Sequence, residues 1–270
     1  MSAEVVAGLA LLGFGVGVVG TLVGAGGGFL LAPVLLLVYP HDSPQTLTSI
    51  SLAAVWANST SGTIAYLRQH RVDIRSGLVF GAATLPGAVG GALLVGHVPR
   101  RAFDAIMAVV LGSVAVWLSI YRRFDLHRTL GGSPRVLVDA GGREWRYAVP
   151  VGRGIGFSVA VGFLSSFLGI GGGIFHVPIL VTLLGFPTHI ATATSHFVLA
   201  LMSGAGVVTH IAQGAYRTGH GLRRSLALSV GLAVGAQLGA RLSARTSSVA
   251  IERLLVAGLA IAALRLAVTA

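Results

Sequence analysis

The chain has 270 residues, of which 54% are hydrophobic and only 10% are charged. A soluble domain carries roughly 25% charged residues. This composition, with a mean hydropathy of +0.85, therefore excludes an ordinary soluble protein and predicts a polytopic membrane protein. The net charge is +11, and all 19 basic residues are arginines. They lie between long apolar runs, which fits loops facing membrane lipids and the cytoplasm better than a nucleic-acid surface.

The residue types also exclude several kinds of chemistry. The chain has no cysteine, which excludes disulfides, thiolate metal sites and iron–sulfur clusters. It has no lysine, so a phosphate-binding P-loop is excluded as well. The sequence shows no paired carboxylates and no Ser/His/Asp arrangement, and its histidines are scattered away from carboxylates. We therefore expect no enzymatic activity, no catalytic residues, no metal and no cofactor.

Charged residues divide the chain into apolar runs, and a spanning helix needs about 20 apolar residues. The runs that meet this length are 3–23, 45–67, 77–97, 102–121, 147–166, 190–213, 222–241 and 249–268. Two shorter apolar pieces, 28–39 and 173–184, follow glycine clusters. Each would give roughly 18 Å of helix at about 1.5 Å per residue, too short for roughly 30 Å of hydrocarbon. We interpret these pieces as half-helices of broken or re-entrant elements.

A hydrophilic stretch with six arginines separates the chain into two halves. Within it, we expect a small hairpin with arms at 135–139 and 143–147. The resulting organisation is a first transmembrane repeat at 1–121, a basic cytoplasmic linker at 122–146 and a second transmembrane repeat at 147–270.

The two halves carry the same motif. Gly24–Pro33 reads GAGGGFLLAP and Gly169–Pro178 reads GIGGGIFHVP, so both follow G-x-G-G-G-x-x-x-x-P at an offset of 145 residues. The pairs Thr48-Ser49 and Thr194-Ser195 recur at an offset of 146. A repeat at a nearly fixed offset indicates one ancestral unit used twice. Duplicated halves around a central site are common in transporters.

Three consecutive glycines at membrane depth interrupt a helix, because glycine adopts positive φ without strain and leaves amides exposed. The half-helix that follows offers its positive N-terminal end to an anion. The glycines expected to bind substrate are Gly24, Gly26, Gly27, Gly28, Gly169, Gly171, Gly172 and Gly173. The alternative is close helix packing through small residues. Pro33 and Pro178 follow the glycines and are expected to break the half-helices and act in gating.

Polar residues inside the apolar runs form a second set. Those expected to bind substrate beside the glycines are Thr48, Ser49, Thr194, Ser195 and His196. The candidates for a proton relay are His176, His196 and His210. Asn58 is interpreted as an interhelical hydrogen-bonding residue. A cation site would normally need a carboxylate inside the membrane. Its absence from the middle of the apolar runs, together with the glycine amides, favours an anionic solute.

The number of crossings depends on the glycine elements. If each crosses once, the chain crosses about eight times, and segments 122–153 and 217–224 both lie in the cytoplasm. If each crosses twice, the halves are inverted and 217–224 lies outside. The arginine distribution does not separate these alternatives. Because the half-helices are short, we expect eight crossings.

The paired glycine motifs, the Thr-Ser pairs, the stretch Ser61–Tyr66 and the run Pro86–Ala92 resemble the sulfite exporter TauE/SafE family. This family is also called the toluene-sulfonate uptake permease family. The resemblance covers nearly the whole chain and is weakest in the linker. It implies an integral carrier of the plasma (inner) membrane for sulfur-containing anions such as sulfite and sulfonates.

We therefore expect an all-α membrane bundle of two homologous halves that moves a small anion by alternating access. Coupling to protons is one option for the driving force. The alternatives are a passive anion channel, which would keep a continuous polar pore, and a membrane subunit without transport activity. The sequence leaves open the substrate, the direction of transport, the coupling ion and whether identical chains form a homo-oligomer.

Overall fold

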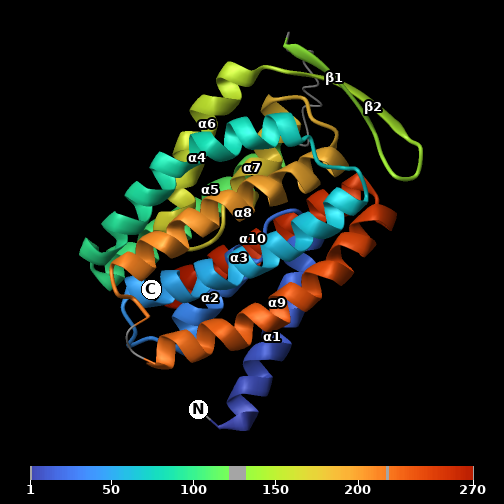
Figure 1. Cartoon of the computed structure of the whole chain (residues 1–270). Coiled ribbons are helices and arrows are strands. Elements are labelled where there is room, and N and C mark those ends of the chain that lie inside the picture. Colours follow the sequence, from blue (N-terminus) through green and yellow to red (C-terminus); the bar gives the residue numbers. More distant parts are fainter. Residues whose placement is uncertain (1, 122–131, 217–218, 270) are drawn as a thin grey trace.

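The computed structural model describes residues 2–121, 132–216 and 219–269, which are predominantly helical (Figure 1). The described helices of 18 residues or more are α1 Ala3–Leu22, α3 Pro44–Arg68, α4 Ile74–Leu94, α5 Arg100–Tyr121, α6 Val151–Leu168, α8 Thr188–Ala212, α9 Gly219–Arg245 and α10 Ser248–Thr269. Each overlaps one of the apolar runs predicted from the sequence. The shorter elements are α2 Gly28–Val38, α7 Gly173–Pro178, a π-helical turn η2 Ile179–Leu183 and a 3₁₀ turn η1 Val95–His97.

Helix ends follow ordinary capping chemistry. The Ser43 hydroxyl accepts a hydrogen bond from the Thr46 amide (3.2 Å) at the start of α3. The Asp73 carboxylate accepts one from the Ser76 amide (3.0 Å) at the start of α4. These side chains satisfy amides that have no helical acceptor. Helix α6 ends at Gly169, whose φ of 67° is the left-handed conformation that favours glycine.

The distribution of side chains suits a lipid environment. Large apolar residues such as Leu11 and Val109 point outward, with 71% and 68% of their surface exposed, whereas many serines, threonines and histidines are buried. A soluble protein shows the opposite tendency for polar residues. Among the described residues, the helices long and apolar enough to cross a membrane are Ala3–Leu22, Ile74–His97, Val151–Leu168, Thr188–Ala212 and Gly221–Arg245.

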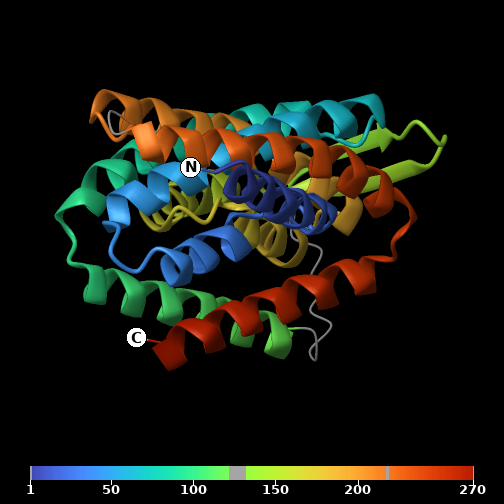
Figure 2. The ribbon, with the colours of Figure 1, turned by 90° about the horizontal axis from the view of Figure 1, so that it is seen from below.

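The two halves are interleaved through glycine-lined interfaces. On α9, Gly231, Gly235 and Gly239 lie against the backbone of α1, and on α4, Gly87 and Gly91 lie against the backbone of α6. A side-chain carbon at any of these positions would overlap the facing backbone, so the glycines permit the close approach. Helices α5 and α10 pack on each other along one side of the bundle (Figure 2).

The contacts also fix the helix directions. Residues further along α9 contact residues further along α1, so these two helices are parallel. The same holds for α4 and α6. Helix α3 is likewise parallel to α9, and α4 is parallel to α8. In contrast, Gly62 of α3 meets His196 of α8 whereas Leu52 meets Gly206, so α3 and α8 are antiparallel. Helices α1, α3 and α9 therefore run one way, and α4, α6 and α8 run the other.

Each glycine element returns to the end of the bundle from which it started. Asp42, in the turn after α2, pairs with Arg224 near the start of α9 (2.6 Å), beside the start of α1. Phe186, after η2, packs on Tyr147 just before α6, with ring centroids 4.9 Å apart. The expectation of one net crossing per glycine element is therefore wrong. The glycine segment lets the chain reverse, so α1 with α2, and α6 with α7, form hairpins.

The described part of the linker forms the expected hairpin, and linker residues 122–131 lie outside the described residues. Strand β1 Ser133–Val138 pairs antiparallel with β2 Glu144–Val149. The Ala140 amide donates to the Gln69 carbonyl (2.9 Å), and the Tyr147 hydroxyl donates to the Asp73 carboxylate (3.0 Å). These bonds attach the hairpin, through its turn and β2, to the segment between α3 and α4 (Figure 1). We call this end of the bundle the hairpin end.

Candidate functional site

The segments Gly24–Gly28 and Gly169–Gly173 meet inside the bundle, and we call this contact the glycine crossing. All ten residues are buried. Gly28 lies against the carbonyl of Ile170, and Gly173 lies against the carbonyl of Gly24. The chain reverses through positive φ, for example 80° at Gly24 and 67° at Gly169. The glycines therefore serve both backbone reversal and close packing.

Each glycine segment is held by a hydroxyl from the other half. Ser51 of α3 donates to the carbonyl of Gly169 (2.5 Å), and Ser195 of α8 donates to the carbonyl of Gly24 (3.1 Å). The serines are 144 residues apart and the glycines 145 apart, so the two bonds are equivalent. Ser51 was not among the residues expected at the site. Aligning α3 with α8 at an offset of 144 would have found it.

The Thr-Ser pairs expected at the site divide between two places. Thr48 lies against the glycine crossing, and Ser195 bonds to it. The Ser49 hydroxyl instead donates to a carbonyl of its own helix (2.8 Å). The Thr194 hydroxyl accepts from the Asp73 amide (3.0 Å) at the hairpin end. Only one member of each pair therefore touches the glycine crossing.

Helices α3 and α8 meet beside the glycine crossing at equivalent positions. The hydroxyl oxygens of Ser59 and Ser203, which are 144 residues apart, lie 3.4 Å from each other. Val55 and Leu199, again 144 apart, both pack against the glycine segments. The contacts of the two halves therefore match at a nearly constant offset around these helices.

A buried polar network lies next to the glycine crossing. The Thr21 hydroxyl donates to the Asn58 side-chain oxygen (3.0 Å), and His196 Nε2 lies 3.2 Å from the former and 3.3 Å from the latter. The Tyr66 hydroxyl donates to the Thr21 carbonyl (2.6 Å). Asn58 also donates to carbonyls of α1 and α9, which confirms its interpretation as an interhelical hydrogen-bonding residue.

The other two intramembrane histidines have different surroundings. His176 Nε2 lies 3.2 Å from the Ser158 hydroxyl. Both ring nitrogens of His210 are buried without a hydrogen-bond partner among the described residues. In the described part of the chain, no hydrogen bond joins His176, His196 and His210 to one another.

The prolines differ in effect. Helix α2 continues past Pro33 to Val38, whereas the α-helix ends at Pro178 and gives way to the π-helical turn. A proline removes one amide donor and disturbs the preceding turn. The regular α-helix therefore breaks after Pro178 but continues past Pro33.

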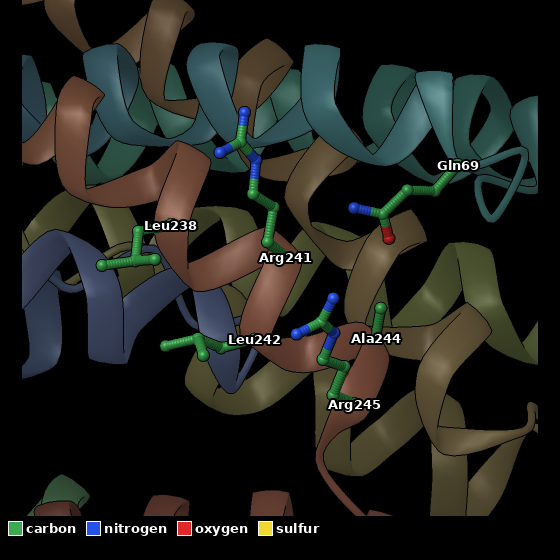
Figure 3. Close-up of a pocket in the computed structure, with 6 residues that line it drawn as sticks. All are labelled: Gln69, Leu238, Arg241, Leu242, Ala244 and Arg245. Carbon is green, nitrogen blue, oxygen red and sulfur yellow. The ribbon is translucent and has the colours of Figure 1, made fainter.

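Two adjoining pockets open at the hairpin end. The larger, of about 500 Å³, is lined by Gln69, Leu238, Arg241, Leu242, Ala244 and Arg245 (Figure 3). The smaller, of about 300 Å³, shares two of these residues, and we call it the hairpin pocket. It is lined by Gln69, Arg71, Asp139, Ala140, Gly141, Arg143, Trp145, His189 and Ala244. Among the described residues, no cluster of three His, Asp or Glu side chains could hold a metal ion.

Long apolar helices, outward-facing large apolar side chains and polar groups buried between helices define an all-α polytopic membrane protein. The chain belongs to the sulfite exporter TauE/SafE family, whose model matches residues 9–266. This is a family of membrane transporters.

Relatives from distant organisms carry the same kind of name. The chain is 32% identical to the probable membrane transporter protein YunE of Bacillus subtilis, over 76% of this chain and 78% of the relative. It is 26% identical to a probable membrane transporter protein of Methanocaldococcus jannaschii, over 75% and 71%. The Escherichia coli K12 protein YfcA, also named a probable membrane transporter, is 27% identical over 64% and 58%. No solved structure matches the chain.

Proposed function

We propose that the protein is a secondary transporter that carries a small anion, a sulfur oxyanion or an organosulfonate, across the plasma membrane. The observation that carries this proposal is the glycine crossing. Two equivalent re-entrant segments start from opposite ends of the bundle and meet inside it, each held by a serine of the other half. Transporters commonly place their substrate where broken helices of two inverted repeats meet.

The preference for an anion rests on backbone amides. Helices α2 and α7 both begin at the glycine crossing, and the positive end of a helix attracts negative charge. Among the described residues, the amides of Gly28 and Phe29, and those of Gly173 and Ile174, have no hydrogen-bond acceptor. A buried amide without an acceptor costs free energy, which a bound oxyanion would relieve.

Access to these amides requires motion. The carbonyls of Ile170 and Gly24 lie against Gly28 and Gly173, so the two segments cover one another. We propose that they separate toward one end of the bundle and then toward the other. The matched contacts at offsets of 144 and 145 support two duplicated, inverted repeats, 1–121 and 147–270, that move against each other.

Orientation follows from the arginines. Ten arginines with described side chains lie at or near the hairpin end: Arg68, Arg71, Arg75, Arg135, Arg143, Arg146, Arg153, Arg241, Arg245 and Arg253. Four lie toward the other end: Arg100, Arg101, Arg223 and Arg224. Because cytoplasmic loops carry an excess of arginine, we place the hairpin end and the linker in the cytoplasm.

We assign proton coupling to His196. It contacts Thr21 and Asn58 beside the glycine crossing, whereas the other two intramembrane histidines take no part in this network. Histidine is the side chain whose unperturbed pKa lies nearest physiological pH. In this proposal His196 senses the separation of the glycine segments through the shared hydrogen bonds.

Flux assays in proteoliposomes test the proposal. Sulfite, sulfate, methanesulfonate and chloride are offered with and without a pH gradient. We expect saturable flux of at least one sulfur anion that responds to the gradient. Flux that neither saturates nor responds to the gradient would indicate an anion channel. No flux of any anion from correctly inserted protein would favour a subunit without transport activity.

A further inference from the structure

The hairpin pocket contains a buried guanidinium that forms no ion pair with a carboxylate of the described residues. Arg71, in the turn between α3 and α4, is only 5% exposed. Its Nη1 donates to the Gln69 side chain (3.2 Å). Among the described residues, no carboxylate lies within ion-pair distance of Arg71, and no other hydrogen bond reaches its guanidinium. Burial lowers the pKa of Arg71, although the nearby charge of Asp139 opposes this shift, because a charge held away from water is costly.

The remaining wall of the pocket supplies further donors. The Arg143 guanidinium lies 4.0 Å from the ring centre of Trp145, and the ring of Trp145 lies beside that of His189 (5.9 Å between centroids). His189 Nδ1 is buried without a hydrogen-bond partner in the described part of the chain. Cationic and N–H groups facing a cavity are the groups that recognise oxyanions.

The carboxylate in the pocket is already satisfied by the hairpin. Asp139 accepts from the amides of Gly141 (2.9 Å) and Arg143 (3.0 Å) and from the indole of Trp145 (3.1 Å). These bonds hold the turn between β1 and β2. The hydrogen bonds of Asp139 are therefore made within the hairpin, and its single negative charge is outnumbered by the positive charges of Arg71 and Arg143 in the pocket lining.

We propose that the hairpin pocket is a cytoplasmic oxyanion site that loads the transporter, with the anion bound by the fork of Arg71 and by Arg143 and His189. The inference rests on the proposed function and names where its substrate first binds. His189 and Ser195 lie on the same helix, roughly 9 Å apart at about 1.5 Å per residue. His189, in the wall of this pocket, is thus between one and two helical turns from the serine that bonds the glycine crossing.

The larger pocket beside the hairpin pocket adds to the electrostatic attraction of anions. Arg241 and Arg245 line it beside Gln69, which also lines the hairpin pocket (Figure 3). Neither arginine has a hydrogen-bond or ion-pair partner among the described residues. Clustered positive charge around a cleft raises the local anion concentration and speeds binding.

Fluorescence of Trp145 reports binding directly. The chain has three tryptophans, so Trp56→Phe and Trp117→Phe leave Trp145 as the reporter. The purified full chain, in nanodiscs of phosphatidylcholine only, is titrated with sulfate and with methanesulfonate at constant ionic strength set by chloride. We expect a saturable change in emission, and Arg71→Gln to weaken the apparent affinity about tenfold or more. Arg146→Gln, an exposed arginine paired with Glu144, is the matched control and should bind normally.

Additional variants and lipid compositions distinguish the possible outcomes. Arg71→Lys and Arg143→Gln are tested as well, so that a failure of Arg71→Gln to fold leaves two variants that should weaken binding. An unsaturable signal, or equal affinity in all variants, would overturn the proposal. A signal change with phosphatidylglycerol nanodiscs but none with free sulfate or methanesulfonate would assign the pocket to lipid phosphate and overturn it too. Flux is measured separately. Binding without transport would refute the proposed function but support the anion site. Transport without this binding would support the proposed function but refute the site.

Discussion

Alanine at Gly173 would place a Cβ on the carbonyl oxygen of Gly24 and on the backbone of Ala25. Neither backbone atom can move without disturbing the glycine crossing. We expect Gly173→Ala to destabilise the protein by about 1–3 kcal/mol through overpacking and to abolish flux. Gly15→Ala is the control, because nothing lies within 4 Å of its Cβ position. It should be neutral or gain up to about 1 kcal/mol in helix propensity. Thermal unfolding in detergent and flux in proteoliposomes measure both, and identical behaviour of the two variants would contradict the tight crossing.

Ser51 and Ser195 make equivalent buried bonds, so their removal should have similar effects. Ser51→Ala or Ser195→Ala leaves a glycine carbonyl unsatisfied, and we expect each to cost about 1–3 kcal/mol. Ser113→Ala is the comparison, because its exposed hydroxyl bonds only to its own helix. That change should stay within about 0.5 kcal/mol. If thermal unfolding shows Ser51→Ala to be no worse than Ser113→Ala, the serine does not hold the crossing.

The sequence predicted part of this site for a clear physical reason. Matched glycine motifs mark a break in the helix wherever the helices lie, so the glycines could be named in advance. The hydroxyls could not all be named, because a helix turns by about 100° per residue. An offset of 146 instead of 144 rotates the alignment of α3 and α8 by about 200°. That rotation selected Ser49 and Thr194, which face elsewhere, and missed Ser51.

At the scale of elements, the β-hairpin should be sensitive to acid. Desolvation raises the pKa of Asp139, but hydrogen bonds from Trp145 and from the amides of Arg143 and Gly141, with the nearby Arg71 charge, lower it overall. A carboxyl whose pKa is lowered on folding stabilises the fold above its ordinary pKa, near 4. That contribution is lost as the pH falls through the lowered value. We expect the hairpin turn to stay docked between about pH 5 and 7 and to loosen below about pH 4.

Emission of Trp145 in the single-tryptophan background measures this docking. Asp139→Asn removes the charge and one acceptor, so at pH 7 it should already show the emission of the acid form. Glu144→Gln changes an exposed carboxylate paired with Arg146 on the same strand and should leave the profile unchanged. Emission that does not change down to pH 3 in the parent would show that Asp139 does not hold the turn.

Helix bounds were approximately predictable because charged residues lie at the ends of the apolar runs, as at Asp73 before α4 and Arg245 at the end of α9. The direction in which α2 runs could not be predicted from the sequence. A glycine cluster permits either an interrupted helix or a reversal, and both leave the same short apolar piece. Contacts distant in sequence decide between them, such as Asp42 with Arg224. No local pattern contains that information.

At the scale of the whole molecule, reversal at both glycine segments determines the arrangement of the halves. With α1 and α2 paired as a hairpin, α3 runs in the same direction as α1. The second half then begins at the hairpin end and repeats the order in the opposite sense. The two reversals start from opposite ends and meet at the glycine crossing, and the proposed alternating access depends on this geometry.

Cysteine labelling in cells tests this inversion. The chain has no native cysteine, and both Ser133 and Gly219 are exposed, so Ser133→Cys and Gly219→Cys give clean single sites. Ser133 begins β1 at the hairpin end, and Gly219 begins α9 at the other end. With the arginine-rich hairpin end in the cytoplasm, a membrane-impermeant maleimide should label Gly219→Cys in intact cells. It should label Ser133→Cys only after permeabilisation. If only Ser133→Cys were labelled from outside, the halves would still be inverted, but the hairpin end would face the outside of the cell. Equal accessibility of both positions would place the two ends on one side, and the glycine segments could then not enter from opposite faces.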